Sequence, residues 1–377
     1  MQTVFKIAWG NTFQNLKRTL TALGGITFSI LLVFLQLGFL NGAKKEVTLL
    51  FDYFDFDIAI TSDRYQFMAT APPFDRIRLI QAKVDSSIDE SFLLNVRSGR
   101  WFDEATELES SLLLIGLDDQ AGFIVNDDFV EGLKTITNGQ SVFLDRFSHA
   151  DYGSLEVGRK GFINGAQVNV TSLFDLGLFF FAEGSAATNN GNFLKLSGRT
   201  ADDVTIGLLK VKEGHSPQET VARLRQLLPD DVLVVTKDDF FKREQDYFIE
   251  VKPIGIMFKS AVFIAFAVGL VILFQVLSTE LSNRLNEFAT MKAMGFSIPF
   301  IYGIGIIQNL IITFLSFFPA WLVCVGVFEL IYALSKLPME MTFELFLTVF
   351  GLTMLMSITA GILALRKVKK ADPAELF

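Results

Sequence analysis

The residue types that most often carry chemistry are sparse in this chain. Its two histidines, His149 and His215, lie far apart, and neither stands at metal-ligand spacing from a cysteine or a carboxylate. The single cysteine, Cys324, falls inside an apolar run. The sequence contains no phosphate-binding G-x-x-x-x-G-K-[ST] loop, no G-x-G-x-x-G after a strand pattern and no G-x-S-x-G elbow. We therefore predict no catalytic, cofactor-binding or metal-binding residue on this chain, which makes it a non-enzyme.

Adjacent carboxylates are the remaining candidates for acid–base chemistry or calcium binding. They adjoin turn residues and lack the spaced ligands of a calcium loop, so we interpret them as solvated turns: Asp118/Asp119, Asp127/Asp128, Asp202/Asp203 and Asp230/Asp231. Polar residues inside the apolar runs could line a substrate path or join helices: Gln36, Gln275, Gln308, Asn309 and Glu329. Because uncharged amides commonly hydrogen-bond between membrane helices, we expect packing roles for them.

The apolar residues that surround these positions are concentrated in a few long runs. The chain has 377 residues, 51% of them hydrophobic, and a mean hydropathy of +0.42. Runs long enough to cross a hydrocarbon core of about 30 Å predict transmembrane helices at residues 21–40, 254–278, 298–334 and 345–365. The third run contains Pro319, and we interpret it as one long helix because two spans would leave almost no turn.

Residues 41–253 form a polar segment with the length of one large domain or two small ones. This segment holds 22 Lys and Arg against 34 Asp and Glu, a net charge of −12, whereas the rest of the chain carries +4. The positive-inside rule therefore places the segment outside the membrane and both termini in the cytoplasm. We also expect an interfacial helix at 1–20, an uncleaved first span, and a basic cytoplasmic tail at 366–377.

The polar segment carries both strand and helix patterns, so the predicted fold is an α+β membrane protein with a mixed α/β domain between the first two spans. Strand-like runs lie at 57–61, 112–116, 167–171, 204–212 and 232–236. Ser216 and Glu219 form a capping box that opens a helix through Leu228, which predicts a β-α-β unit with the last strand. We expect a mobile loop at Gly184 to Asn192 and a rigid helical stalk over 238–250.

The segment between the second and third runs, residues 279–297, has the pattern of a short amphipathic helix. Arg284 and Glu287 are spaced to pair, and Gly295 is a helix stop. Periodicity alone leaves two interpretations open, a helix on the membrane surface and a helix that contacts a partner. The apolar face of this helix consists of Leu281, Leu285, Phe288 and Met291.

Specific residues in this segment resemble the R-x-x-E-x-A-x-x-K/R-A-x-G loop of the FtsX-like/MacB-type permease family: Arg284, Glu287, Ala289, Lys292, Ala293 and Gly295. The opening FKIAW…LKRTLTALGGI and the closing RKVKKADPAELF are similar to the two ends of that family. The stretch FDIAITSDRYQFMATAPPF, residues 56–74, looks like the DevC branch, whose members carry no fused ATPase. One departure is that Gln308 and Asn309 stand where many members have a glutamate.

The resemblance implies the membrane-spanning permease subunit of an ABC-type exporter in a bacterial inner membrane. Its partners would be a second copy of the chain, an ABC ATPase subunit that carries ATP and Mg, a periplasmic adaptor (membrane fusion) protein and an outer-membrane channel, without nucleic acid. Residues 279–297 would be the coupling helix that contacts the ATPase through Leu281, Arg284, Leu285, Glu287, Phe288, Met291, Lys292 and Gly295.

Within this family, ATP hydrolysis on the partner is thought to move the periplasmic domain, a mechanism called mechanotransmission. An alternative from another class is an FtsX-like signalling protein that activates a periplasmic cell-wall hydrolase without transporting anything. A secondary transporter would carry inverted repeats and charges at the membrane midplane, which the sequence lacks. The sequence does not name the substrate; glycolipid follows from the DevC branch alone.

Overall fold

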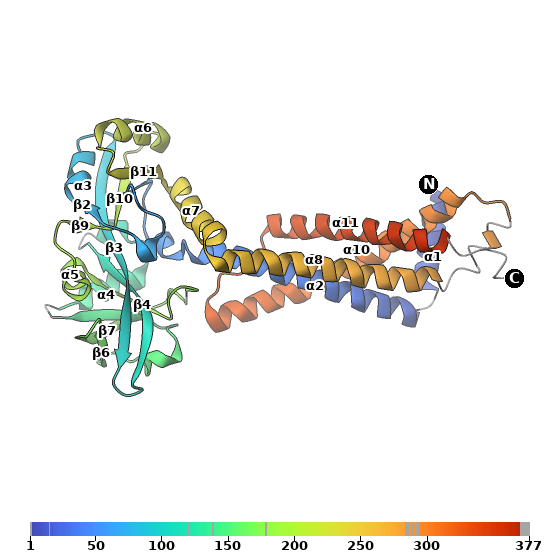
Figure 1. Ribbon diagram of the computed structural model, residues 1–377, viewed down its shortest axis with the longest axis horizontal. Coiled ribbons are helices and arrows are strands. Elements are labelled where there is room, and N and C mark those ends of the chain that lie inside the picture. The colour runs from blue at the N-terminus through green and yellow to red at the C-terminus, as the bar shows by residue number, and fades with distance from the viewer. Residues whose placement is uncertain are drawn as a thin grey trace. The chain divides into compact units, whose positions relative to one another are not determined.

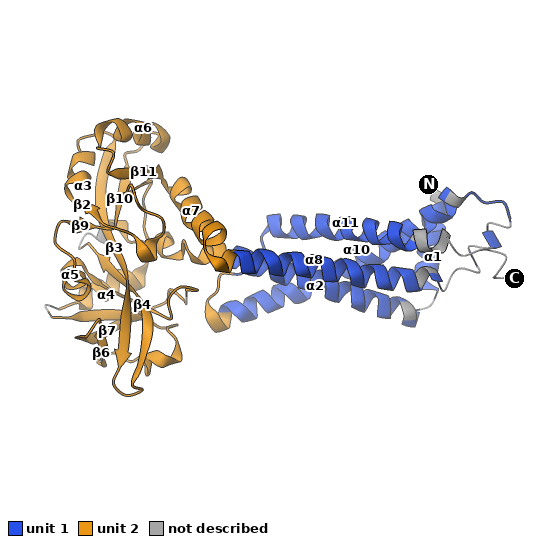
Figure 2. Cartoon of the chain, viewed as in Figure 1, with its two compact units in different colours: residues 1–42, 256–332, 339–377 blue, residues 43–255, 333–338 orange. Residues whose placement is uncertain are grey.

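The structure is a computed structural model that describes residues 2–14, 16–118, 121–137, 139–177, 179–282, 287, 290–291 and 294–369. The chain divides into two compact units, coloured separately in Figure 2. We call residues 1–42, 256–332 and 339–377 the helical unit, and residues 43–255 and 333–338 the sheet unit.

Among the described residues of the chain, four helices are long and apolar enough to cross a membrane. They lie within α2 (Leu16–Glu46), α8 (Pro253–Ser282), α10 (Ile298–Ser335) and α11 (Phe343–Lys369), and the shorter α1 (Gln2–Phe13) precedes them (Figure 1). α10 continues through Pro319 as a single helix. The expected fold class is confirmed, because the sheet-rich part of the chain lies between the first and second of these helices.

Inside the helical unit, polar side chains hydrogen-bond between helices. The Asn309 amide of α10 donates to the backbone carbonyl of Ser357 in α11 at 2.7 Å, and the hydroxyls of Thr313 and Ser357 lie 2.9 Å apart. Glycine allows close approach elsewhere, since a Cβ on Gly38 would lie 2.2 Å from the Phe328 ring. These features match the packing of membrane helices, in which small residues and neutral polar groups join the helices.

The sheet unit contains a nine-stranded sheet in the order β11-β1-β10-β3-β4-β8-β5-β7-β6. Its first part follows the chain order β1 (Ile58–Ser62), α3 (Ile77–Ala82), β3 (Ile88–Asp103), β10 (Ile206–Val211), α6 (Pro217–Leu227) and β11 (Val232–Thr236). All neighbouring strands here are antiparallel, which gives a ferredoxin-like β-α-β-β-α-β arrangement. α3 and α6 contribute Leu79, Val221 and Leu224 to the core that covers this part of the sheet.

The second part of the sheet unit is inserted between β3 and β10 and closes on itself. It consists of the distal half of β3 with β4 (Leu108–Leu117), β5 (Ser141–Asp145), β6 (Lys160–Ile163), β7 (Ala166–Phe174) and β8 (Ser185–Asn189). Because β6 pairs with β3 at Trp101 and Phe102, these six strands form a small barrel, which we call the barrel lobe. Its core holds Trp101 and Tyr152, whose rings stack at 5.5 Å.

Short elements complete the sheet unit. The helices α4 (Asp127–Thr135) and α5 (Asn190–Ser197) pack on the barrel lobe, and β2 (Phe74–Asp75) pairs with β9 (Asp203–Val204). The 3₁₀ turns are η1 (Leu49–Tyr53), η2 (Met68–Thr70), η3 (Ala121–Phe123) and η4 (Ala150–Tyr152).

The expectation of a mobile loop at Gly184 to Asn192 is wrong. These residues form β8, which is buried between β4 and β5, and the first turn of α5, which the Asn189 side chain caps. The small residues reflect crowding, because a Cβ on Gly184 would lie 2.4 Å from the Ser148 hydroxyl oxygen. A Gly- and Asn-rich composition therefore marks a strand with little room around it here.

Candidate functional site

The segment that leads from the sheet into α8 is the first candidate. α7 (Lys237–Asp246) is followed by a π-helical turn, η5 (Tyr247–Val251), and then by Lys252 in an extended conformation before α8 begins at Pro253. Residues 238–250, the expected stalk, are helical, and a break at Lys252 separates them from α8, because a residue before proline avoids the α-helical region. Gly255 allows the turn, since a Cβ there would lie 1.8 Å from the Ile249 carbonyl oxygen. We call residues 237–255 the joint.

A buried carboxyl side chain lies at the centre of the joint. Glu244 of α7 is fully buried and accepts a hydrogen bond from the Met68 amide at 3.3 Å. Its other oxygen and the neighbouring Tyr65 hydroxyl have no hydrogen bond of good geometry within the described ranges. Burial, and after it the nearby Glu244 carboxyl, raises the pKa of Tyr65. Burial raises the pKa of Glu244 to about 8, so the carboxyl is mostly protonated at neutral pH.

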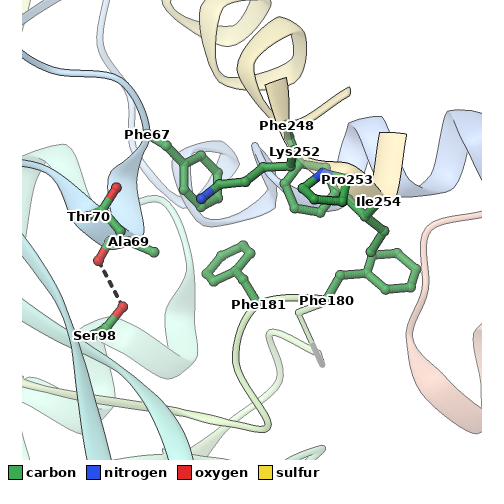
Figure 3. A pocket seen from close by; sticks show the side chains of 10 residues that line it. All are labelled: Phe67, Ala69, Thr70, Ser98, Phe180, Phe181, Phe248, Lys252, Pro253 and Ile254. Carbon is green, nitrogen blue, oxygen red and sulfur yellow. Dashed lines mark hydrogen bonds between the residues drawn. The ribbon is translucent and has the colours of Figure 1, made fainter. Parts of the chain in front are cut away.

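A cavity of about 390 Å³ lies beside the joint, within the sheet unit (Figure 3). Phe67 belongs to its lining, with its ring centroid 4.9 Å from that of Phe181 and 5.9 Å from that of Phe248. Two polar groups of the lining already bond to each other, because the Ser98 hydroxyl donates a hydrogen bond to the Ala69 carbonyl at 2.8 Å. We call this cavity the aromatic pocket; it is lined by Phe67, Ala69, Thr70, Ser98, Phe180, Phe181, Phe248, Lys252, Pro253 and Ile254.

One charged residue, Lys252, contributes to the lining of the aromatic pocket. Its ammonium group lies 5.4 Å from the centroid of the Tyr247 ring, a cation–π distance. Sequence reasoning missed this pocket. The run Phe179, Phe180 and Phe181 within an otherwise polar segment is the signal that indicates an aromatic site there.

The structure describes only some of the predicted coupling residues. Arg284, Leu285, Phe288 and Lys292 lie outside the described residues, and Leu281 falls in the last turn of α8. Glu287 is exposed, and Gly295 has a φ of +90° in a turn before α10, as a helix stop requires. Met291 is half-buried and packs against the cluster formed by Ala8, Ile304 and Ile311. The N-terminal helix α1, this end of α10 and the Met291 side chain therefore belong to one apolar cluster.

Other titratable side chains serve the fold. Asp145 in the barrel lobe is buried and accepts hydrogen bonds from the amides of Phe147, Leu176 and Gly177. Asp103 pairs with Arg159. Within the described ranges, His, Cys, Asp and Glu side chains form no group of three or more that could hold a metal ion. Candidate function therefore rests on the joint, the aromatic pocket and the 279–297 loop.

Comparison with known proteins gives a family match for the C-terminal part of the chain. Residues 259–373, which hold most of α8, the loop, α10 and α11, match the family described as FtsX-like permease C-terminal. No curated protein matches the chain.

Three solved structures are similar to about half of the chain. The extracellular domain of the noncanonic ABC-type transporter YknZ from Gram-positive bacteria is 14% identical, with a TM-score of 0.32, over 48% of this chain and 98% of that one. The periplasmic region of MacB from Actinobacillus actinomycetemcomitans is 13% identical, with a TM-score of 0.35, over 52% and 96%. A domain of a permease protein from Porphyromonas gingivalis is 10% identical, with a TM-score of 0.31, over 48% and 92%.

The match over residues 259–373 includes the loop whose residues resembled that family in the sequence, and it does not distinguish the DevC branch from others. Over this region the chain is similar to the FtsX-like permease family, and four helices among the described residues are long and apolar enough to cross a membrane.

Proposed function

We propose that this chain is the permease subunit of an ABC-type exporter that works with a separate ATPase subunit. The observation that carries the proposal is the FtsX-like match over α8, the loop, α10 and α11, combined with a large sheet unit that precedes α8 in the chain. Both termini and residues 279–297 face the cytoplasm of a bacterial inner membrane in this proposal, and the acidic sheet unit faces the periplasm, as the charge distribution favours.

In the proposed mechanism, the ATPase contacts the 279–297 loop and the resulting movement reaches the sheet unit through α8. Contacts within the joint support this idea. The Cα of Gly255 packs closely against the backbone of Ile249. The Glu244 side chain of α7 accepts a hydrogen bond from the Met68 amide of η2, which connects these two elements. A second copy of the chain, a periplasmic adaptor and an outer-membrane channel complete the proposed assembly. The exported molecule would be an amphiphile such as a glycolipid if the DevC resemblance holds.

The test is purification of the full chain from native membranes, followed by mass spectrometry of the proteins that accompany it. We expect an ABC ATPase to co-purify with the wild-type chain and to be lost from Leu285→Glu, since an apolar anchor at an interface does not tolerate a buried charge. Ser154→Glu is the control, because Ser154 is an exposed residue of the sheet unit, outside residues 279–297. Retention of the ATPase by Leu285→Glu would show that the loop is not the coupling element.

The same experiment separates export from signalling. An adaptor protein among the co-purified partners supports an exporter, whereas a periplasmic cell-wall hydrolase in its place would assign the chain to the FtsX-like signalling class. Absence of any ATPase from the wild-type preparation would overturn the ABC-type assignment itself.

A further inference from the structure

We propose that the aromatic pocket binds the apolar chain of an anionic membrane amphiphile, whose head group pairs with the Lys252 ammonium. The inference rests on the proposed export function and deepens it, since it names the chemical class of molecule that the sheet unit would handle. Phe67, Phe181 and Phe248 form the apolar wall, and Lys252 supplies the charge.

The size and lining of the pocket fit an apolar chain. Its volume of about 390 Å³ lies within the range of about 300–1,000 Å³ that is typical of small-molecule sites. The rings of Phe67 and Phe248 are closely parallel, with an interplanar angle of 28°, and Phe181 meets Phe67 edge-on at 87°. Such ring faces and edges offer dispersion contacts to methylene groups without demanding hydrogen bonds.

The charge at the pocket selects an anionic head group. Lys252 is the one charged side chain in the lining, and its interaction with the described residues is a cation–π contact with Tyr247. The ion pairs among the described residues do not include Lys252, so an incoming anion would gain a charge-assisted hydrogen bond without displacing a carboxylate. A cationic head group would be repelled, and a neutral oxygen would accept a hydrogen bond without the attraction between opposite charges.

The place of the pocket in the chain favours a molecule that comes from the bilayer. The lining includes Pro253 and Ile254, the first residues of α8, and the candidate span itself begins at Pro253. A lysine immediately before an apolar span stands at the level of the lipid head groups. Figure 3 shows Lys252 extending from the end of η5, with Phe180 and Phe181 on a separate loop of the sheet unit.

An occupant of this pocket would touch the joint. Phe248 and Lys252 belong to the joint, whereas Phe67 immediately precedes η2, the turn whose Met68 amide donates to Glu244. A chain inserted among these residues therefore contacts both segments that the buried carboxyl connects. The pocket thus offers a direct way for bound amphiphile and the conformation of the joint to influence each other.

The test uses the full chain in nanodiscs of phosphatidylcholine and a photoreactive probe, dodecanoate with a diazirine near its methyl end. After irradiation, mass spectrometry locates the labelled residues. We expect labelling within 67–70, 180–181 and 248–254 that excess dodecanoate removes, and that equal concentrations of dodecanol or dodecyltrimethylammonium do not. Labelling confined to α10 and α11, or equal competition by the cationic amphiphile, would overturn the proposal.

A second arm of the experiment identifies the source of the amphiphile. Phosphatidylglycerol added to the nanodisc would compete if a bilayer lipid occupies the pocket, whereas competition by dodecanoate alone would indicate a single-chain molecule. Both outcomes fit an anionic amphiphile. Competition by neither would overturn the proposal, because the labelling would then be non-specific.

Variants test the role of the charge. Lys252→Gln should weaken dodecanoate binding about tenfold or more, since a charge-assisted bond is lost. Lys237→Gln is the matched control, because Lys237 also makes a cation–π contact, over Phe56, and lies outside the lining. Unchanged binding by Lys252→Gln would contradict the proposal. If Lys252→Gln unfolds, Phe180→Ser, at a side chain that is 43% exposed, tests the apolar wall by the same labelling.

Failure of this proposal can be distinguished from failure of the proposed function. Specific labelling of the pocket in a chain that purifies without an ATPase would overturn only the ABC-type assignment. Co-purification of the ATPase together with an unlabelled pocket would overturn only the amphiphile site.

Discussion

The barrel lobe and the joint each bury a carboxyl side chain, and they stabilise it in different ways. Asp145 in the barrel lobe accepts hydrogen bonds from the amides of Leu176 at 3.1 Å and Gly177 at 2.8 Å, besides that of Phe147. Glu244 in the joint accepts one, from Met68 at 3.3 Å. Burial raises both pKa values, but that of Asp145 only to about 6, because its amide donors favour the charged form, and that of Glu244 to about 8.

This difference separates a structural carboxylate from a titratable one. At neutral pH, Asp145 is ionised and satisfied, so it fixes the loop that follows β7. Glu244 is protonated and has an oxygen without a hydrogen bond in the described part of the chain. Natural folds seldom leave a fully buried polar atom in this state without a compensating role. The stability of the joint should therefore change around neutral pH more than that of the barrel lobe.

The largest effect is expected from Asp145→Ala. The substitution leaves three amide groups without an acceptor; those of Leu176 and Gly177 are buried, and each buried one costs about 1–3 kcal/mol. We expect the free energy of unfolding of the barrel lobe to fall on the order of 4 kcal/mol. The measurement is denaturant unfolding followed by Trp101 fluorescence, in a chain where Trp9 and Trp321 are replaced by phenylalanine.

The control for this prediction is Glu156→Ala, at an exposed residue in the same lobe, which should change stability by no more than about 0.5 kcal/mol. A cost for Asp145→Ala as small as that of the control would mean that solvent replaces the carboxylate, and the contrast with the joint would disappear.

The next effect, of opposite sign, is expected from Glu244→Gln. The folded pKa of about 8 lies above the ordinary value of 4.5, so this carboxyl destabilises the fold progressively as pH rises from about 4.5 to 8. Glutamine imitates the protonated form and has no such dependence. We expect the variant to be more stable than the wild type on the order of 3 kcal/mol at pH 7, with no difference below about pH 4.5.

Hydrogen exchange of the amides in 237–251, measured between pH 5 and 8 and corrected for intrinsic rates, reports this difference. Tyr65 and Arg243 face the same carboxyl; burial holds the pKa of Tyr65 well above this range, so its hydroxyl stays neutral. Asp246→Asn, at an exposed end of α7, is the control and should leave the pH dependence intact. An unaltered pH profile in Glu244→Gln would show that the carboxyl is ionised and compensated, like Asp145.

A smaller loss, about 2 kcal/mol, is expected from Gly255→Ala. The added Cβ would lie 1.8 Å from the backbone oxygen of Ile249, so the end of η5 must move, and overpacking of this kind costs roughly 1–3 kcal/mol. Gly326→Ala is the control, because it is the same substitution at a position where the added Cβ meets open space. Protease cleavage within 247–255 should increase in the first variant alone; equal cleavage in both would mean that the joint is already loose.

The sequence predicted those parts of this comparison that depend on local pattern. The N-cap at Ser216 and the strand at Val232–Thr236 form as expected, because a cap and a valine-rich run act through neighbouring residues. β8 and the aromatic pocket were missed, because they depend on residues far apart in the chain: Gly184 meets Ser148 and Tyr152, and Phe181 meets Phe67. The interruption at Lys252 was predictable in principle, since Pro253 is visible in the sequence.

The smallest effect is expected in the helical unit, which extends the comparison to neutral polar groups. Asn309 is buried, and its amide bonds to the Ser357 carbonyl, so Asn309→Leu should lose about 0.6 kcal/mol, the average for such bonds between membrane helices. Gln275→Leu, at a more exposed position, should cost less. Thermal unfolding in detergent measures both.

If Asn309 lined a substrate path instead, its replacement would change which molecules are exported while stability stayed the same. An amide held by Ser357 and adjoining Thr313 has its polar atoms engaged in packing, so we expect a loss of stability with unchanged export preference.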